Sequence, residues 1–480
     1  MIAMPSPRIQ STVCGQVVTD LEGRRYTLAK LIGQGGQGDV FEVKEGRLAV
    51  KLLRSVSESE RQRLRRCIQA VKRLDLAGLP IASPIAVLGP PHVGYLMQLA
   101  AGMSSLRAMM VPPADGRSVT AWYVATGGLR ARLQKLVAIF DVFSRLHGRG
   151  LVYGDPSPQN ILFGSDGNHS WAFLIDADNL HVQRDATASG VFTPGYGAPE
   201  LIRGDMGPDT LTDAFALAVI AFELLTLVHP FVGNLVHDGE PELEEAAFRG
   251  DMPWIEHTTD LKNRSSRGID RDIVISPEVK KLFKRMFEDG LKDRLARPGL
   301  GEWVSALSQA ADVTITCPHC QASFYAPQRR ECPWCGQPRP QLSLAVVYLW
   351  DPEITFATGA SPGGFVKTST SQSRSLATIV LAPKESVQIL RRHVHSDDAS
   401  DQTEQPLVEI TRTRADSIRV RNLSQESFLL VKHTGQDKTI DSLGVAAEKP
   451  IPIASQSPHW HLHFGPLDRL HRAVVFKPMP

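Results

Sequence analysis

Hydrophobic and polar positions follow three different patterns along the 480-residue chain. In residues 16–310 strand-like alternation and helix-like periodicity take turns, which predicts an α+β domain. A short Cys-rich segment follows at residues 314–340. In residues 341–480 short alternating strands such as PLVEITRT, DSIRVRN and SFLLVKH are separated by polar turns, which predicts an all-β sandwich. The pattern therefore predicts three domains with these boundaries.

Composition and charge exclude several classes of protein. Lys and Arg number 53 and Asp and Glu 51, so the overall charge gives no reason to expect nucleic-acid or membrane binding. The stretch MIAMPSPRIQSTVC lacks the apolar core of a secretory signal. The longest apolar run, Ala214 to Val228, is short and contains Glu223, so a buried helix is expected there. Four of the six Cys form metal-like pairs, which fits a cytoplasmic protein.

A glycine-rich stretch, LIGQGGQGDVFEV, places Gly33, Gly35 and Gly38 in GxGxxG spacing ahead of Val40. In a dinucleotide-binding fold these glycines open a helix, whereas here DVFEVKEG and RLAVKLL are both strand-like. Two strands joined by a glycine loop can form a flap whose backbone N–H groups approach phosphates. Lys51 on the second strand can then hold phosphate oxygens. The alternative is a plain hairpin with an exposed lysine.

The stretch YGDPSPQN can be laid on the kinase catalytic loop HRDxxxxN, with Asp155 and Asn160 at the two functional positions. Downstream, FLIDADN places Asp176 at the end of an apolar strand. The motif TPGYGAPE and the run TDAFALAVIAFELL follow in the order expected of kinases.

Together these motifs resemble a bacterial eukaryotic-like Ser/Thr protein kinase over roughly the first three-fifths of the chain. The resemblance implies a bilobal fold, ATP and Mg²⁺ as cofactors, and transfer of the γ-phosphate to Ser or Thr of a partner protein. It gives catalytic roles to Asp155, Lys51 and Asn160, and magnesium to Asn160 and Asp176. The nucleotide-binding residues that it implies are Gly33, Gly35, Gly38, Val40, Lys51, Gln98, Ala100, Asn160 and Asp176.

Other matches to the family concern the adenine site and the core of the large lobe. In YLMQLAAG, Met97 stands at the gatekeeper position, with the backbone of Gln98 to Ala100 facing the base. The resemblance also implies that Glu200 of the APE motif pairs with Arg297. It places Asp213, buried, at the start of the central helix.

Several positions depart from the family pattern. Gly154 replaces the Arg that receives a phosphorylated activation loop, so that switch is not expected. Ser157 replaces the usual Lys that faces the γ-phosphate. The DFG triplet reads Asp-Ala-Asp: Tyr153 is expected to fill the space left by the missing Phe, and Asp178 is expected to accept the positive φ of the missing Gly.

The acidic helix residue that should pair with Lys51 is less clearly marked. Glu58 and Glu60 come earlier than the usual spacing and Asp75 later, and we favour Glu60. These departures leave open a pseudokinase scaffold that binds nucleotide without catalysis. The presence of every phosphoryl-transfer group favours an active enzyme. A small-molecule phosphotransferase shares the Asp–Asn pair, but the APE motif disfavours it.

The sequences CPHC and CPWC place Cys317, Cys320, Cys332 and Cys335 in two knuckles that can complete one tetrahedral Zn²⁺ site. The segment resembles a zinc ribbon and has few apolar residues, so the metal is expected to order it. Two redox CxxC pairs are the alternative, but they require a thioredoxin-like fold. Little positive charge lies nearby, so nucleic-acid binding is not expected.

The C-terminal domain is weakly similar to FHA domains, through DSIRVRNLSQESFLLV and HLHFGP. That similarity implies a phosphoprotein partner. The family's Gly-Arg and Ser-x-x-His motifs are missing, so no phosphate-binding residue is assigned. His459, His461 and His463 fall on one face of a strand. Exposed strand histidines are more common than metal ligands, so no metal is expected there.

Overall fold

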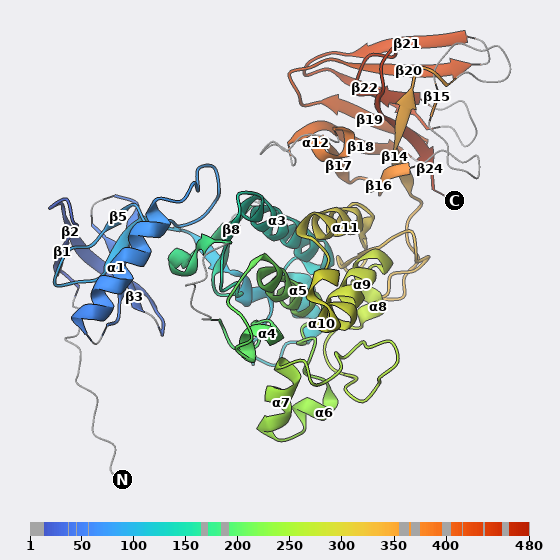
Figure 1. Ribbon diagram of the computed structural model, residues 1–480. Coiled ribbons are helices and arrows are strands. Elements are labelled where there is room, and N and C mark those ends of the chain that lie inside the picture. The colour runs from blue at the N-terminus through green and yellow to red at the C-terminus, as the bar shows by residue number, and fades with distance from the viewer. Residues whose placement is uncertain are drawn as a thin grey trace. The chain divides into compact units, whose positions relative to one another are not determined.

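The computed structural model describes residues 14–36, 38–44, 46–55, 57–164, 171–183, 192–354, 364–365, 375–395, 405–414, 416–434, 437–453 and 460–479 (Figure 1). The chain divides into two compact units. The first comprises residues 1–119, 134–270 and 279–304, and the second comprises residues 120–133, 271–278 and 305–480.

The first unit begins with a six-stranded antiparallel sheet in the order β1-β2-β3-β4-β6-β5. Its strands are β1 (Val17–Thr19), β2 (Arg25–Gln34), β3 (Gly38–Val43), β4 (Leu48–Leu53), β5 (Ala86–Val87) and β6 (Gly94–Gln98). Side chains alternate along β4, so Val50 joins an apolar cluster on one face while Ala49 joins another on the opposite face. Lys51 follows the direction of Ala49.

Helix α1 (Glu58–Lys72) covers that second face, beside the strands in Figure 1. Ser57 caps the helix by accepting the N–H of Glu60 at 3.1 Å, and acidic residues in the first turn complement the helix dipole. The inward side of the helix is apolar: Ile68 is buried among sheet residues and Leu64 packs against the same cluster.

The rest of the first unit is mostly helical. Its small strands form two further sheets, of order β10-β9-β7 and β11-β8. The elements from here to residue 312, some of which lie partly or, like α8, wholly in the second unit, are β7 (Met103–Ser105), η1 (Leu106–Met109), α2 (Val119–Ala125), α3 (Gly128–Gly148), β8 (Leu151–Val152), β9 (Ile161–Gly164), β10 (Ala172–Leu174), η2 (Ala177–Asn179), β11 (His181–Val182), α4 (Pro199–Ile202), α5 (Thr210–Thr226), α6 (Asn234–His237), α7 (Pro241–Phe248), α8 (Arg271–Val274), α9 (Pro277–Lys284), η3 (Arg285–Asp289), α10 (Gly290–Lys292), η4 (Arg294–Ala296) and α11 (Leu300–Asp312).

Helix α5 is the centre of this helical part. It is apolar on all sides and nearly all its residues are buried, as expected of a helix surrounded by protein. Asp209 and Thr212 form a capping box at its start. Phe222 packs edge-on against Phe283 at 5.1 Å between ring centroids, which explains why the run Ala214 to Val228 tolerates no polar face.

A buried ion pair joins the APE motif to a distant loop. Arg297 donates to both oxygens of Glu200, at 2.7 and 2.9 Å, and both side chains are almost completely shielded from solvent. The bidentate geometry satisfies both groups. The pairing expected from the family resemblance is confirmed.

Replacing Arg297 by Ala should lower the free energy of unfolding by about 3–5 kcal/mol, because it leaves the Glu200 carboxylate buried without its partner. Chemical denaturation of the purified chain measures this loss. Arg203→Ala is the matched control: that guanidinium pairs with Asp205 at 2.8 Å on the surface, where an ion pair contributes about 0–1 kcal/mol. Equal losses in the two variants would contradict the prediction.

The second unit contains the Cys-rich segment and the C-terminal strands. Strands β12 (Thr314–Thr316) and β13 (Ser323–Tyr325) form a hairpin with the first knuckle between them, and the second knuckle follows β13. Phe324 and Ile315 are fully buried in a cluster that also includes Leu342 and Val380 from the following domain. The segment therefore has more apolar support than its own composition indicates, because its neighbour supplies part of the core.

The C-terminal strands form two antiparallel sheets, one of order β15-β14-β24-β23-β20-β21 with β16 paired to β14, and one of order β17-β18-β19-β22. Side chains from both sheets share one core, among them Val347, Val474 and Ile410. The predicted β-sandwich is confirmed. The elements are β14 (Ser343–Asp351), β15 (Gly364–Phe365), β16 (Ser375–Leu381), β17 (Ser386–Leu390), α12 (Arg391–Val394), β18 (Pro406–Arg414), β19 (Ser417–Asn422), β20 (Phe428–Thr434), β21 (Asp437–Leu443), β22 (Glu448–Pro452), β23 (Trp460–His463) and β24 (His471–Pro478).

The expectation of exposed histidines on β23 is wrong for His463, which is fully buried. Its Nδ1 lies 2.8 Å from Nε2 of His471, and its ring packs edge-on against Trp350. Packing between strands, rather than exposure, explains this histidine. His459 lies outside the described residues. In the part of the chain that the structure describes, no helix is long and apolar enough to span a bilayer.

Candidate active site

One buried carboxylate anchors the loop that carries the YGD motif. Asp213, at the start of α5, is fully buried and accepts the backbone N–H of Tyr153 at 2.8 Å and of Gly154 at 3.0 Å. His147 of α3 also lies 3.0 Å from this carboxylate. Gly154 has a φ of 90°, and a Cβ there would lie 3.1 Å from the carbonyl oxygen of Asn179. The local backbone therefore favours glycine where most kinases carry Arg.

Asp155 follows directly and presents its side chain to the loop at residues 192–197. Its Oδ1 accepts the backbone N–H of Thr193 at 2.6 Å and the hydroxyl of the same residue at 2.8 Å. Burial raises the pKa of Asp155 above its usual value, although the hydrogen bonds from Thr193 oppose this shift. The carboxylate is thus already hydrogen-bonded to a hydroxyl, the group that a Ser or Thr substrate would offer.

Asn160 lies directly before β9 and Asp176 lies just after β10, and these two strands pair with each other. The backbone N–H of Ile175 donates to the carbonyl of Asn160 at 2.9 Å, which ties the end of β10 to the loop before β9. The amide nitrogen of Asn160 lies 3.4 Å from the carbonyl of Asp155. Both side chains are partly exposed. An amide oxygen and a carboxylate are ligand types that Mg²⁺ takes together with phosphate oxygens, so the chemistry of these residues fits the ion.

Tyr153 occupies the interior beneath these groups, as its volume leads us to expect. It is fully buried, its ring packs edge-on against Phe143, and its hydroxyl donates to the carbonyl of Ile175. Ala177 is also fully buried. The hydroxyl thereby supports the residue immediately before Asp176, a contact that a smaller side chain could not make.

Lys51 is buried and its ammonium pairs with two carboxylates, Asp176 and, at 2.5 Å, Asp178. Burial by itself lowers the pKa of Lys51, but the two negative charges outweigh it and the pKa lies above its usual value. We expected Lys51 to pair with Glu60, whereas its ion pairs in the structure are with Asp176 and Asp178. Glu58, in the same turn of α1, pairs with Arg61 at 2.7 Å instead. Both carboxylates that pair with Lys51 lie at the start of η2 or within it.

The left-handed backbone conformation also falls on a different residue from the one expected. Asp176 has a φ of 63° and starts the 3-10 turn η2, whereas Asp178 lies inside that turn. The position that carries Asp in place of Gly therefore needs no positive φ. The turn directs the side chain of Asp178 inward, toward Lys51.

The glycine loop connects β2 and β3 as predicted. The N–H of Gly35 donates to the carbonyl of Gly38 at 2.9 Å, which closes the turn. A Cβ on Gly38 would lie 2.2 Å from the carbonyl oxygen of Leu52, so only glycine fits there. At Gly33 a Cβ would meet the Val40 side chain at an ordinary 3.7 Å. The close approach of two strands, rather than a phosphate, thus determines one of the three glycines.

The residues expected around adenine lie at and after the end of β6. Val40 is opposite Lys51 in the β3–β4 register. Val40, Ala100 and Leu162 are partly buried members of one apolar cluster, which offers a surface for a planar base. Met97 is buried beside them, as expected of a gatekeeper. The N–H of Leu99 donates to the carbonyl of Arg47, so the neighbouring residues Gln98 and Ala100 are the better candidates for contacts with the base.

The four cysteines of the second unit converge on one point. Their sulfur atoms all lie within 4.8 Å of one another, with Cys317 and Cys335 at 3.7 Å and Cys320 and Cys332 at 3.6 Å. A regular tetrahedron around an ion with bonds of about 2.3 Å has edges of about 3.8 Å. The close pairs join one knuckle to the other, so the arrangement fits a single Zn²⁺ rather than two separate redox pairs.

The loop after residue 191 rests on two partly buried side chains, Glu223 and His229. The hydroxyl of Tyr196 donates to Glu223 at 2.7 Å, which accounts for the one carboxylate within the apolar run of α5. Nδ1 of His229 accepts the N–H of Phe231 at 3.2 Å, so its Nε2–H donates to the carbonyl of Gly195 at 2.8 Å. Residues 184–191, where an activation-loop phosphorylation site would fall, lie outside the described residues.

Burial of His229 predicts a loss of stability in mild acid. Its folded pKa is lowered to about 4, below the unfolded value of 6.5, so the unfolded chain gains a proton first as the pH falls. This contribution to stability is complete above pH 6.5 and is lost toward pH 4. Between pH 7 and pH 5 the free energy of unfolding should fall by about 2 kcal/mol more than in His229→Gln.

Denaturant unfolding at the two pH values measures this difference. His237→Gln is the control, because His237 is exposed and its removal should leave the pH dependence of the wild type unchanged. If His229→Gln lost as much free energy of unfolding between pH 7 and pH 5 as the wild type does, His229 would not be the source of this pH dependence.

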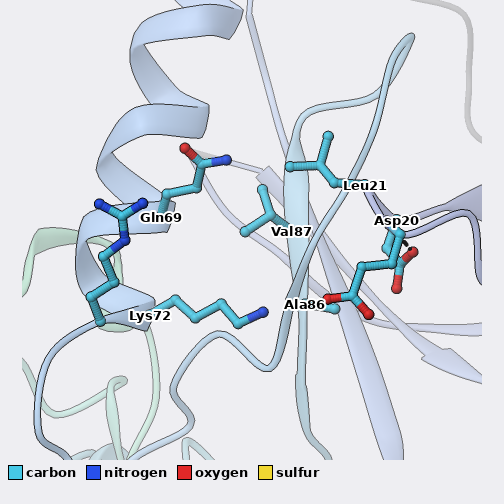
Figure 2. A pocket seen from close by; sticks show the side chains of 8 residues that line it. Asp20, Leu21, Gln69, Lys72, Ala86 and Val87 are labelled. Carbon is cyan, nitrogen blue, oxygen red and sulfur yellow. Dashed lines mark hydrogen bonds between the residues drawn. The ribbon is translucent and has the colours of Figure 1, made fainter.

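A separate cavity of about 350 Å³ lies beside α1 (Figure 2). Gln69 and Lys72 reach it from the helix, Val87 from β5 and Asp20 from the turn after β1. It is lined by Asp20, Leu21, Glu22, Gln69, Lys72, Arg73, Ala86 and Val87. None of the predicted site residues lines it, so it is distinct from the candidate active site.

Comparisons with known proteins agree with this geometry. A sequence model of the protein kinase domain matches residues 26–305. The serine/threonine-protein kinase PkaB of Streptomyces coelicolor is 29% identical over 236 residues, which cover 44% of this chain and 51% of the relative. The protein kinase YegI of Escherichia coli is 26% identical over 344 residues, which cover 65% of this chain and 49% of the relative. The chain spans about half the length of these curated relatives. The fold class expected for the first region is confirmed.

Proposed function

We propose an activity for this chain from one premise: it belongs to the protein kinase family. The activity is transfer of the γ-phosphate of ATP to Ser or Thr of a partner protein. The observation that carries the proposal is the meeting of Asp155, Asn160, Asp176 and Lys51 within one unit, with the Asp155 carboxylate already hydrogen-bonded to the hydroxyl of Thr193.

Each residue of the site has a role that follows from its chemistry. The glycine loop and Lys51 hold the phosphates of ATP, with adenine against Val40 and the backbone of Gln98 and Ala100. Asn160 and Asp176 hold Mg²⁺, which neutralises charge on the phosphates when bound. Asp155 accepts a hydrogen bond from the substrate hydroxyl and orients it toward the γ-phosphate. It takes up the proton as the new P–O bond forms and the bond from the γ-phosphorus to the bridging oxygen breaks, which releases ADP.

An assay with γ-labelled ATP tests the activity directly. The purified chain, incubated with a lysate that lacks its own kinases, should transfer label to Ser or Thr of protein, and phosphoamino-acid analysis identifies the acceptor. Label on small molecules alone would point to a different phosphotransferase. ATP binding without any transfer would point to the scaffold.

We also propose a structural zinc site in the second unit. Cys317, Cys320, Cys332 and Cys335 bind one Zn²⁺ as a structural ribbon, supported by their sulfur–sulfur separations. Thiolate ligands suit the reducing cytoplasm that the cysteine pattern indicates. The domain boundaries at residues 16–310, 314–340 and 341–480 are part of the same proposal.

A phosphoprotein partner of the C-terminal domain has weaker support. It rests on the similarity to FHA domains alone, and the sequence lacks the two motifs through which that family reads phosphothreonine. We therefore place recognition of the protein substrate in the kinase domain, next to Asp155 and the loop at residues 192–197.

A further inference from the structure

Lys51 has two carboxylate partners, and they differ in their surroundings. The side chain of Asp178 is 11% exposed and that of Asp176 is 27% exposed. Asp178 sits within η2, between the fully buried Ala177 and the buried Leu180. Its side chain is thus held by the core, whereas Asp176 lies at the left-handed start of the turn, beside the loop of Asn160.

Helix α1 turns an apolar face toward the sheet that carries Lys51. Leu64 and Ile68 pack in the apolar cluster on that face of the sheet, and Val71 is buried as well. Its acidic residues lie in the first turn, where the side chain of Glu58 is 57% exposed and pairs with Arg61. A buried ammonium needs an opposite charge, and Asp176 and Asp178 supply it.

Strand β6 places a phenol opposite Lys51. Tyr95 is opposite Lys51 in the β4–β6 register and is fully buried. Its hydroxyl and Oδ1 of Asp178 are both buried without a hydrogen-bond partner among the described residues. Lys51 therefore has a buried phenol as its neighbour in the sheet and the Asp178 carboxylate as an ion-pair partner.

We propose that Asp178 is the positioning residue for Lys51, in the role that the helix glutamate has in other kinases. When Mg²⁺ takes Asp176, Asp178 remains on Lys51 and keeps its ammonium directed at the phosphates. The active arrangement of Lys51 then does not depend on the position of α1. This inference rests on the proposed function for its role toward ATP, but the ion pair itself does not.

Nucleotide binding tests the role. The dissociation constant of a non-hydrolysable ATP analogue with Mg²⁺, measured by calorimetry, should rise roughly tenfold in Asp178→Asn, because Lys51 loses its permanent partner. Glu60→Gln is the matched control in α1 and should stay within about twofold of the wild type. In a Lys51→Met background, Asp178→Asn should cause no further loss. The proposal would be overturned if Glu60→Gln weakened binding of the ATP analogue and Asp178→Asn did not. It would also be overturned if Asp178→Asn weakened binding just as much in the Lys51→Met background.

Thermal unfolding of the nucleotide-free chain separates this proposal from the proposed function. Lys51→Met and Asp178→Asn should each lower the unfolding temperature, and the double variant should fall less than the sum of the two. Lys51→Met and Glu60→Gln should be additive. A wild-type chain that binds no nucleotide would refute the proposed function. The unfolding temperatures of the single and double variants would still show whether Lys51 and Asp178 pair. Additive effects of Lys51→Met and Asp178→Asn would refute the pairing even in an active kinase.

Discussion

Asp155→Asn should lower the rate of phosphoryl transfer by roughly a hundred- to ten-thousandfold, the usual contribution of a positioned acid or base. Asn keeps the shape of Asp and its side-chain oxygen can still accept the N–H of Thr193, which now donates at 2.6 Å. It cannot take up the proton of the substrate hydroxyl. The rate of label transfer from γ-labelled ATP measures the loss.

Binding of ATP should be nearly unchanged in the same variant. Asp155 contacts the loop at Thr193, whereas the ammonium assigned to the phosphates belongs to Lys51, which pairs with Asp176 and Asp178. Calorimetry with a non-hydrolysable analogue checks this point. Asp75→Asn is the control, because its side chain is 82% exposed and its loss should leave transfer intact. Equal turnover in wild type and Asp155→Asn would refute the kinase assignment.

Cys332→Ser should release the zinc of the second unit and expose residues 314–340 to proteolysis. A hydroxyl is a poor replacement for a thiolate, and structural zinc contributes about 10–16 kcal/mol to the folding of small zinc domains. Because Cys332 shares an apolar cluster with Phe324, Leu342 and Val380, loosening should reach the edge of the β-sandwich as well. Metal analysis should find one zinc per chain in the wild type.

The matched control for this experiment is Cys67→Ser. Cys67 is exposed on α1, far in sequence from the two knuckles, so its replacement should leave the zinc content and the protease pattern unchanged. Affinity for ATP should be the same in all three proteins, because the nucleotide residues belong to the first unit. Freshly purified protein without zinc would refute the site. Loss of ATP binding on chelation would refute its independence of the kinase domain.

Local spacing explains which features the sequence predicts correctly. The Asp–Asn pair five residues apart, the two CxxC knuckles and the apolar run of α5 each depend on residues close together in the chain. The pairing of Glu200 with Arg297 joins distant residues, and it was expected only because the family resemblance supplied it. In the C-terminal domain, period-two alternation is enough to predict strands and a sandwich, since one face of each strand must be buried.

The sequence by itself determined the order of the kinase motifs and the four cysteines that converge on one point, because short motifs encode them. Only the tertiary structure decided which partners they have. Lys51 pairs with Asp178, 127 positions away, because α1 turns an apolar face inward and η2 turns a carboxylate inward. Likewise His463 is buried because Trp350 and His471 cover it. A buried charge or ring takes whichever partner the packing brings within reach, and distance along the chain does not reveal that choice.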